Sequence, residues 1–170
     1  MLKPNRIRAD TNDDCKKSIA EEMYKIERTF FGCHITLAGS ITETEAREYV
    51  GELERQRSAG YRSQAAIVDA RELIPPEPNA LEILNLPYQM AKETDLQRLA
   101  VIVKSPVVKV QTIQSAYQWK TDDIIRIFDA SKLDNWQKLS LDWAAHGIEP
   151  PDDITYDTGH INLSKLATPE

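Results

Sequence analysis

The 170-residue chain has few of the features that mark the more easily recognised protein classes. Its two cysteines, Cys15 and Cys33, are too few for a disulfide-bonded scaffold. Its six glycines form neither a phosphate-binding loop nor a dinucleotide-binding motif. No apolar run approaches the ~18 residues of a membrane-spanning helix, and the N-terminal residues lack the apolar segment of a signal peptide. We therefore expect a soluble, cytoplasmic protein without integral membrane association.

The chain also lacks an excess of basic residues, since it has 27 acidic and 21 basic residues and a formal net charge of −6. This balance argues against a nucleic-acid partner. Much of the excess lies after residue 148, in a stretch that also contains Pro150, Pro151 and Pro169. The composition predicts an N-terminal arm over 1–22 with a short helix, a folded domain over 23–147, and an acidic tail over 148–170.

The folded domain opens with a pattern of period two that is typical of strands. The two runs, 23–31 and 33–38, meet around Gly32 and predict an antiparallel hairpin. Thr42 and Glu45 then form a capping-box pattern, which predicts the start of a helix. The apolar stripe of this helix follows at helical spacing: Ala46, Tyr49, Val50 and Leu53.

Three short apolar runs, each followed by a helical pattern, predict buried parallel strands. The strands are expected at 65–68, 99–103 and 124–128, and the helices at about 80–94, 106–119 and 131–147. Asn79 is expected to cap the first of these helices, which Pro87 should kink or split. Ser105 should cap the second, and Asp129 or Ser131 the third. The alternation of strands and helices predicts an α/β fold.

Four segments carry a resemblance to a known family: YKIERTFFGCHITLAGSIT, AAIVDARELIPP, LAVIVKSP and IIRIFDASKLDNWQKLSLDW. Over residues 23–147 the chain resembles the STAS fold of anti-sigma-factor antagonists, and more closely the SpoIIAA-like group, which overlaps with lipid-binding CRAL-TRIO domains. The resemblance implies an opening hairpin followed by βαβαβα, a mostly parallel five-stranded sheet and about four helices.

The phosphorylation switch of that family is not expected here. Regulatory STAS domains are phosphorylated on a serine or threonine at the start of the helix that follows the central strand. Between Ala70 and Glu93 the chain has neither residue. The resemblance therefore does not extend to a classical anti-sigma-antagonist role.

No pattern in the chain is typical of an active site. His34, His146 and His160 lack the spacing of metal ligands, so we expect no metal and no cofactor. No nucleophile motif surrounds a serine, and Cys33 has no evident basic partner, which favours a structural thiol. We expect a non-enzymatic protein. An enzyme would need acid–base groups to converge near Asp69.

Charged residues lie where α/β proteins often hold ligands. Asp69, Arg71 and Glu72 follow a predicted buried strand, and ligands of open α/β sheets bind beyond the carboxyl ends of strands. A salt-bridged surface loop is the alternative interpretation. Lys104 and Ser105 precede a predicted helix and form either an anion cradle or a simple helix cap.

The helix expected over 79–94 is apolar on more than one side, which predicts a second apolar surface besides the core. Leu81, Leu84 and Tyr88 are the candidate residues of this surface. We expect it to act in one of two ways. The first is a regulatory or protein-interaction module, a homodimer or a complex with another protein, that uses residues 71–92. The alternative is a carrier or sensor that binds a small apolar or anionic ligand between this helix and the sheet.

Overall fold

The structure, a computed structural model, describes residues 22–151. It opens with the predicted hairpin, formed by β1 (Tyr24–Arg28) and β2 (Gly32–Gly39). The strands pair antiparallel, with Ile26 opposite Ile35. The short helix predicted in the N-terminal arm and most of the acidic tail lie outside the described residues.

The sheet has five strands in the order β1-β2-β3-β4-β5. Its other strands are β3 (Ala65–Leu73), β4 (Arg98–Val103) and β5 (Ile125–Asp129). From β2 to β5 all neighbours run parallel, and only β1 runs antiparallel. The predicted α/β fold with a mostly parallel sheet is therefore confirmed.

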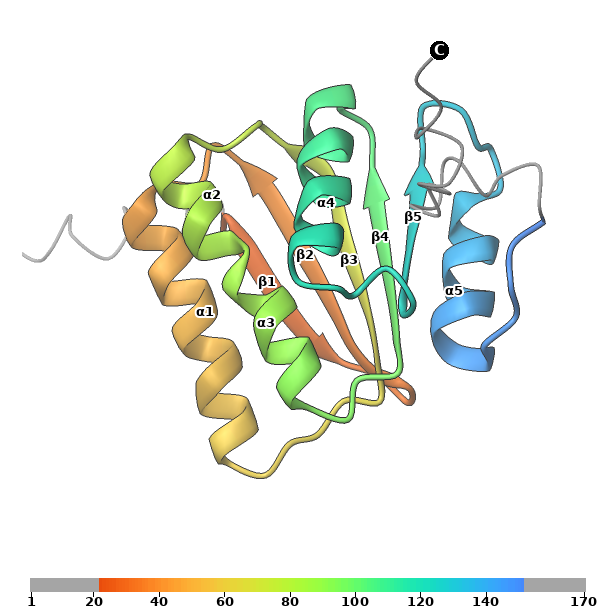
Figure 1. Cartoon of the computed structure of the whole chain (residues 1–170), viewed down its shortest axis with the longest axis horizontal. Coiled ribbons are helices and arrows are strands. Elements are labelled where there is room, and N and C mark those ends of the chain that lie inside the picture. Colours follow the sequence, from red (N-terminus) through yellow and green to blue (C-terminus); the bar gives the residue numbers. More distant parts are fainter. Residues whose placement is uncertain (1–21, 152–170) are drawn as a thin grey trace, which may run out of the picture.

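Helices cover both faces of this sheet (Figure 1). One face packs against α1 (Glu43–Ser58), α2 (Pro78–Leu84), α3 (Leu86–Glu93) and α4 (Pro106–Gln118). The other face packs against α5 (Trp136–His146), whose Trp143 and Ala144 are buried against β3, β4 and β5. The described part of the chain thus has five helices where about four were expected, because the helix expected over 80–94 is divided in two.

Several predicted helix ends are confirmed. Thr42 caps α1 through the capping box: its hydroxyl accepts from the Glu45 N–H at 3.3 Å, and the Glu45 carboxylate accepts from the Thr42 N–H at 2.8 Å. Ser105 caps α4 by accepting from the Val108 N–H. Gly147 ends α5 in the left-handed conformation.

Two predicted helix starts are wrong. α2 begins at Pro78 with Glu77 as its N-cap, so Asn79 lies inside the helix. α5 begins at Trp136, later than a cap at Asp129 or Ser131 would place it. The reason is that the Asp129 carboxylate accepts hydrogen bonds from both the N–H and the hydroxyl of Ser131, which stabilises a turn at the end of β5 in place of a helix.

Gly32 starts β2 at a point where two backbones nearly touch. Its φ is +150°, and a Cβ atom added there would lie 2.0 Å from the carbonyl oxygen of Ala65. Gly51, in contrast, lies within α1 and a Cβ there would meet only the Arg55 side chain at 3.7 Å. The parallel pairing of β2 with β3 therefore depends on glycine at position 32.

Replacing these two glycines with alanine should change stability in opposite directions. Gly32→Ala should lower the free energy of unfolding by more than about 2 kcal/mol, because both the backbone conformation and the close approach disfavour a side chain. Gly51→Ala should raise it by about 0.5–1 kcal/mol, since alanine favours the helix. Urea unfolding of both variants measures this difference, and a Gly32→Ala protein as stable as wild type would contradict the account.

Candidate functional site

A cavity of about 370 Å³ lies between the sheet and the helices α1 and α3. Its floor consists of side chains from β2, β3 and β4, including Ile35, Val68 and Leu99. Leu53 of α1 and Met90 of α3 line its sides. This volume is in the range of small-molecule sites, and an apolar cavity of ~150 Å³ already accommodates benzene.

The cavity owes its floor to small residues in the central strand. Ala66 of β3 lines it and leaves room that a larger side chain would fill. Val68, two residues further on, is only partly buried although β3 is the middle strand of the sheet. A central-strand valine remains partly exposed because the helices above it do not close over it.

The roof of the cavity depends on the break between α2 and α3. α1 packs far more extensively against α2 than against α3, so the helix layer opens along α3. Pro87 lies in the first turn of α3 and lacks the N–H that a continuous helix would need. The side chain of Asn85, the residue between the two helices, accepts a hydrogen bond of 2.6 Å from the Ser115 hydroxyl of α4. The prediction that Pro87 kinks or splits the helix is confirmed.

The interior of the cavity is apolar, with a few polar groups. Burial raises the pKa of the Cys33 thiol, which a hydrogen bond with Ser63 opposes. Burial also raises the pKa of Tyr88 to about 12. The Tyr61 hydroxyl donates to the carbonyl oxygen of Gly32. The raised pKa values keep Cys33 and Tyr88 protonated and uncharged at neutral pH.

Charged residues surround the point where the cavity opens to solvent. Arg57 at the end of α1 lies 3.7 Å from the Glu93 carboxylate at the end of α3. Arg62 lies 3.2 Å from the Asp95 carboxylate, and both of these side chains are more than three-quarters exposed. All four residues line the cavity, so two ion pairs span its mouth from the α1 side to the α3 side.

The structure divides the predicted apolar surface. Leu84 and Tyr88 line the cavity, on either side of the helix break. Leu81 is partly buried and is not among the lining residues. Residues of α1 were not expected at the site, although Tyr49 and Leu53 belong to the predicted apolar stripe. That stripe predicts burial, but it cannot show that part of the buried face lines an open space.

The predicted charged group at Asp69 lies inside a strand, because β3 continues to Leu73. This corrects the expectation that the strand ends at Val68, before Asp69. A bulge in β3 opposite Thr36 and Ala38 shifts the alternation, so Ala70 and Leu73 are buried on the same face. The sequence interpretation relied on a continuous apolar run, and that run stops at the charged Asp69.

The guanidinium of Arg71 contacts two side chains of the same domain, those of Asp69 and Trp136. It donates to both carboxylate oxygens of Asp69, at 2.9 and 2.8 Å, and lies 4.1 Å from the ring centre of Trp136. Glu72, the third predicted residue, is exposed. Lys104 is exposed as well, and Ser105 serves as the cap of α4. Neither group borders the cavity.

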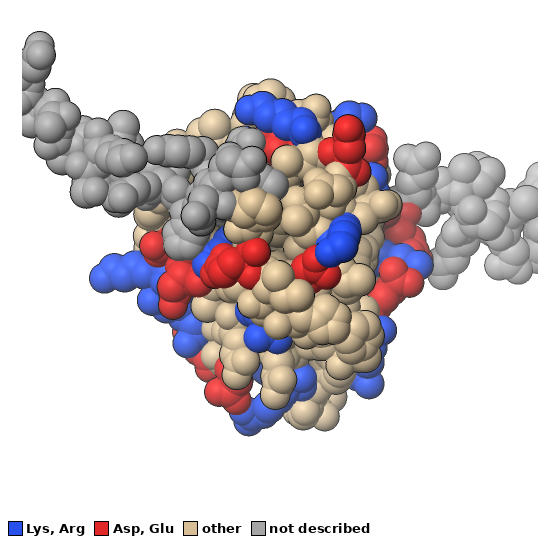
Figure 2. All heavy atoms as spheres, turned by 90° about the vertical axis from the view of Figure 1, so that its right-hand side faces the viewer, with Lys and Arg blue, Asp and Glu red and all other residues tan. Residues whose placement is uncertain are grey.

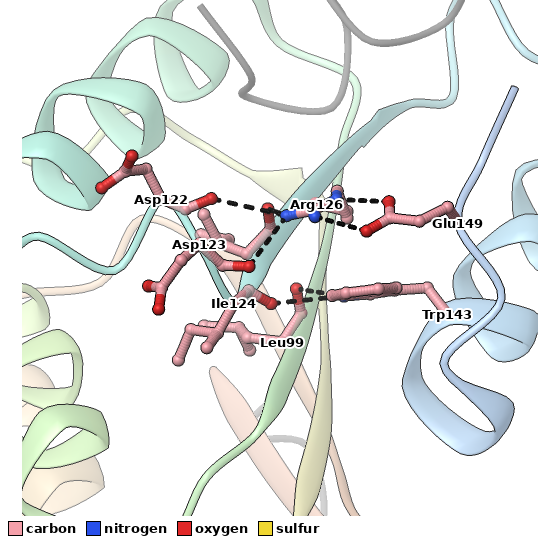
Figure 3. A network of polar contacts seen from close by, with 8 residues as sticks. Leu99, Asp122, Asp123, Ile124, Arg126, Trp143 and Glu149 are labelled. Atoms are coloured by element: carbon pink, nitrogen blue, oxygen red, sulfur yellow. Dashed lines mark hydrogen bonds and ion pairs between the residues drawn. The ribbon is translucent and has the colours of Figure 1, made fainter. Parts of the chain in front are cut away.

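The start of the predicted acidic tail packs onto the domain (Figure 3). The Arg126 guanidinium, buried on β5, donates to both carboxylate oxygens of Glu149 at 2.9 and 2.7 Å. It also lies 4.3 Å from the ring centre of Trp143. The Trp143 indole N–H donates to the carbonyl oxygens of Leu99 and Ile124. This network fixes the backbone of β4 at Leu99, whose side chain lines the cavity from the other face.

Opposite charges lie side by side on the face shown in Figure 2, without a basic stripe among its described residues. In residues 22–151 no three His, Cys, Asp or Glu side chains are placed to hold a metal ion. None of the helices that the structure describes is long and apolar enough to cross a membrane.

Comparison with known proteins gives little beyond the fold. No protein-family model matches the chain, and no curated protein matches it. Among solved structures, it is similar to an uncharacterized protein from the DUF3478 family with a SpoIIAA-like fold, from Shewanella loihica PV-4. The identity is 18%, the match covers 56% of this chain and 77% of that one, and the TM-score is 0.43. The description of that protein names the same fold as the sequence resemblance and no activity.

The carboxyl end of β5 holds a buried ion pair that should make stability depend on pH. Burial opposes ionisation of Asp129, but hydrogen bonds from Ser131 and the Lys109 ammonium, at 3.2 Å, outweigh it and lower the pKa of Asp129. A carboxyl group whose folded pKa is lowered stabilises the fold fully above its unfolded pKa of about 3.9. This contribution is lost as the pH falls through the lower folded pKa.

Asp129→Asn should therefore lower the free energy of unfolding by about 1–3 kcal/mol at pH 7. The difference from wild type should shrink at pH 3 and below, where the wild-type carboxyl also becomes protonated. Urea unfolding at the two pH values measures this, with Asp134→Asn, a change at an exposed position, as the control. A difference that stays constant with pH would contradict the assignment.

Proposed function

We propose that this protein is a non-catalytic module that binds a small, largely apolar molecule in the cavity between α1, α3 and the sheet. The observation that carries the proposal is the cavity itself, a space of about 370 Å³ over the central strand with largely apolar walls, which is in the size range of small-molecule sites. Of the two functions left open by the sequence, the carrier or sensor is therefore the one that the geometry supports best.

The chemistry of the walls supports binding over catalysis. Among the described residues, those that line the cavity include no histidine and no lysine. The one thiol, Cys33, has a pKa raised by burial, whereas a nucleophilic cysteine needs a lowered one. The acidic residues Glu93 and Asp95 lie at the mouth in ion pairs with arginines.

The interaction-module alternative has less support from the same segment. The surplus of apolar residues in 79–94 motivated it, but Ile83 and Leu84 are buried in the core. Within residues 71–92, the exposed large apolar side chains are Ile74 and Leu86. A homodimer remains a prediction that native mass or scattering measurements can check.

Filling the cavity should abolish binding of an apolar probe. In ¹⁵N-labelled wild type, naphthalene should shift the amide signals of Ala66, Val68 and Met90 and leave that of Ile102, on the opposite face, unchanged. Val68→Trp should weaken naphthalene binding at least tenfold, because the indole occupies the space above β3.

Ile148→Trp is the matched control, since it adds an indole at an exposed position outside the cavity. It should bind naphthalene as wild type does. Shifts scattered over the surface, or equal binding by Val68→Trp, would show that the cavity is not a binding site.

A further inference from the structure

Tyr49 is one of the α1 residues that line the cavity. It belongs to the buried stripe of α1, its side chain is only 3% exposed, and it lines the cavity. Its ring packs against the ring of Tyr24, with 5.5 Å between the ring centres. Because Tyr24 does not line the cavity, this packing holds the Tyr49 ring from outside the cavity and helps to fix the position of its hydroxyl.

The structure gives the Tyr49 hydroxyl no hydrogen bond within residues 22–151, unlike the polar groups around it. Cys33 is hydrogen-bonded to Ser63, the hydroxyl of Tyr88 to Thr112, and that of Tyr61 to the Gly32 carbonyl. Because Tyr49 lines the open cavity, a bound molecule can supply the partner that this hydroxyl lacks. The cavity therefore offers a ligand one unused hydrogen-bonding group, and that group lies among apolar walls.

The surroundings of this group select against charge. Burial raises the pKa of Tyr49, so the group remains an O–H that both donates and accepts. The only cations among the described lining residues, Arg57 and Arg62, lie at the mouth and are each paired with an acid. The C-terminal ends of α1 and α3, which carry partial negative charge, also lie there. An anion in the cavity would lack a counter-charge.

We infer that the cavity takes a neutral, largely apolar molecule that carries an oxygen, as a hydroxyl or carbonyl group, and that the Tyr49 hydroxyl selects this oxygen through a hydrogen bond. The inference rests on the proposed function and narrows it. It excludes carboxylates and other anions, which the sequence interpretation had left open as ligands.

Three probes of one shape test this selectivity: naphthalene, 2-naphthol and 2-naphthoate, titrated into the full-length chain. Tyr49→Phe should weaken the binding of 2-naphthol about three- to tenfold, the effect of one hydrogen bond, and leave naphthalene unchanged. Wild type should bind 2-naphthoate at least tenfold more weakly than 2-naphthol, because the carboxylate loses its hydration without gaining a partner.

The matched control is Tyr24→Phe, which removes a hydroxyl from the neighbouring ring that does not line the cavity. It should bind all three probes as wild type does. A second readout is independent of the variants: the ¹³Cζ signal of labelled Tyr49 in wild type should move more with 2-naphthol than with naphthalene.

The outcomes separate the inference from the proposed function. If naphthalene binds in the cavity but Tyr49→Phe affects both neutral probes equally, or if 2-naphthoate binds more tightly than 2-naphthol, the role of Tyr49 is refuted and the proposed function stands. If none of the probes binds in the cavity, both fail.

Discussion

The break between α2 and α3 depends on Pro87, and the cavity depends on this break. α1 packs more extensively against α2 than against α3, so the helix layer opens after the break between α2 and α3. Proline cannot supply the N–H that a continuous helix needs, and the hydrogen bond between Ser115 and Asn85 holds the break in place. The helix layer consequently opens above β3, where Ala66 and Val68 leave a space. The missing N–H of Pro87 thus contributes to an open space between the helices and the sheet.

The features that could be predicted from the sequence are those with a local physical cause. The capping box of Thr42 and Glu45, the cap at Ser105 and the break at Pro87 each follow from backbone chemistry within a few residues. The strands follow from the hydrophobic pattern. The continuation of β3 past Asp69 could not be predicted in this way, because the apolar run ends at this charged residue and a bulge then shifts which side chains face the core. The late start of α5 likewise reflects a competing use of the Asp129 carboxylate.

For a related reason, only some residues of the candidate site could be predicted from the sequence. A sequence pattern shows that a side chain is buried, but burial against a neighbour and burial around an empty space have the same pattern. Leu84 and Tyr88 were therefore named for their surplus of apolar character. The space between the helix and the sheet was named as a place for a ligand, and the structure has a cavity there. Tyr49 was assigned to the core stripe, because only the assembled structure shows that this buried residue also lines the cavity.

The most direct test of the central claim, that the cavity holds a small neutral molecule, is native mass spectrometry of gently purified protein. The account predicts an added mass of a few hundred daltons on wild type, released by denaturation and recovered as a neutral, oxygen-bearing compound. A spectrum that shows only the bare chain, at any subunit number and from several preparations, would contradict it.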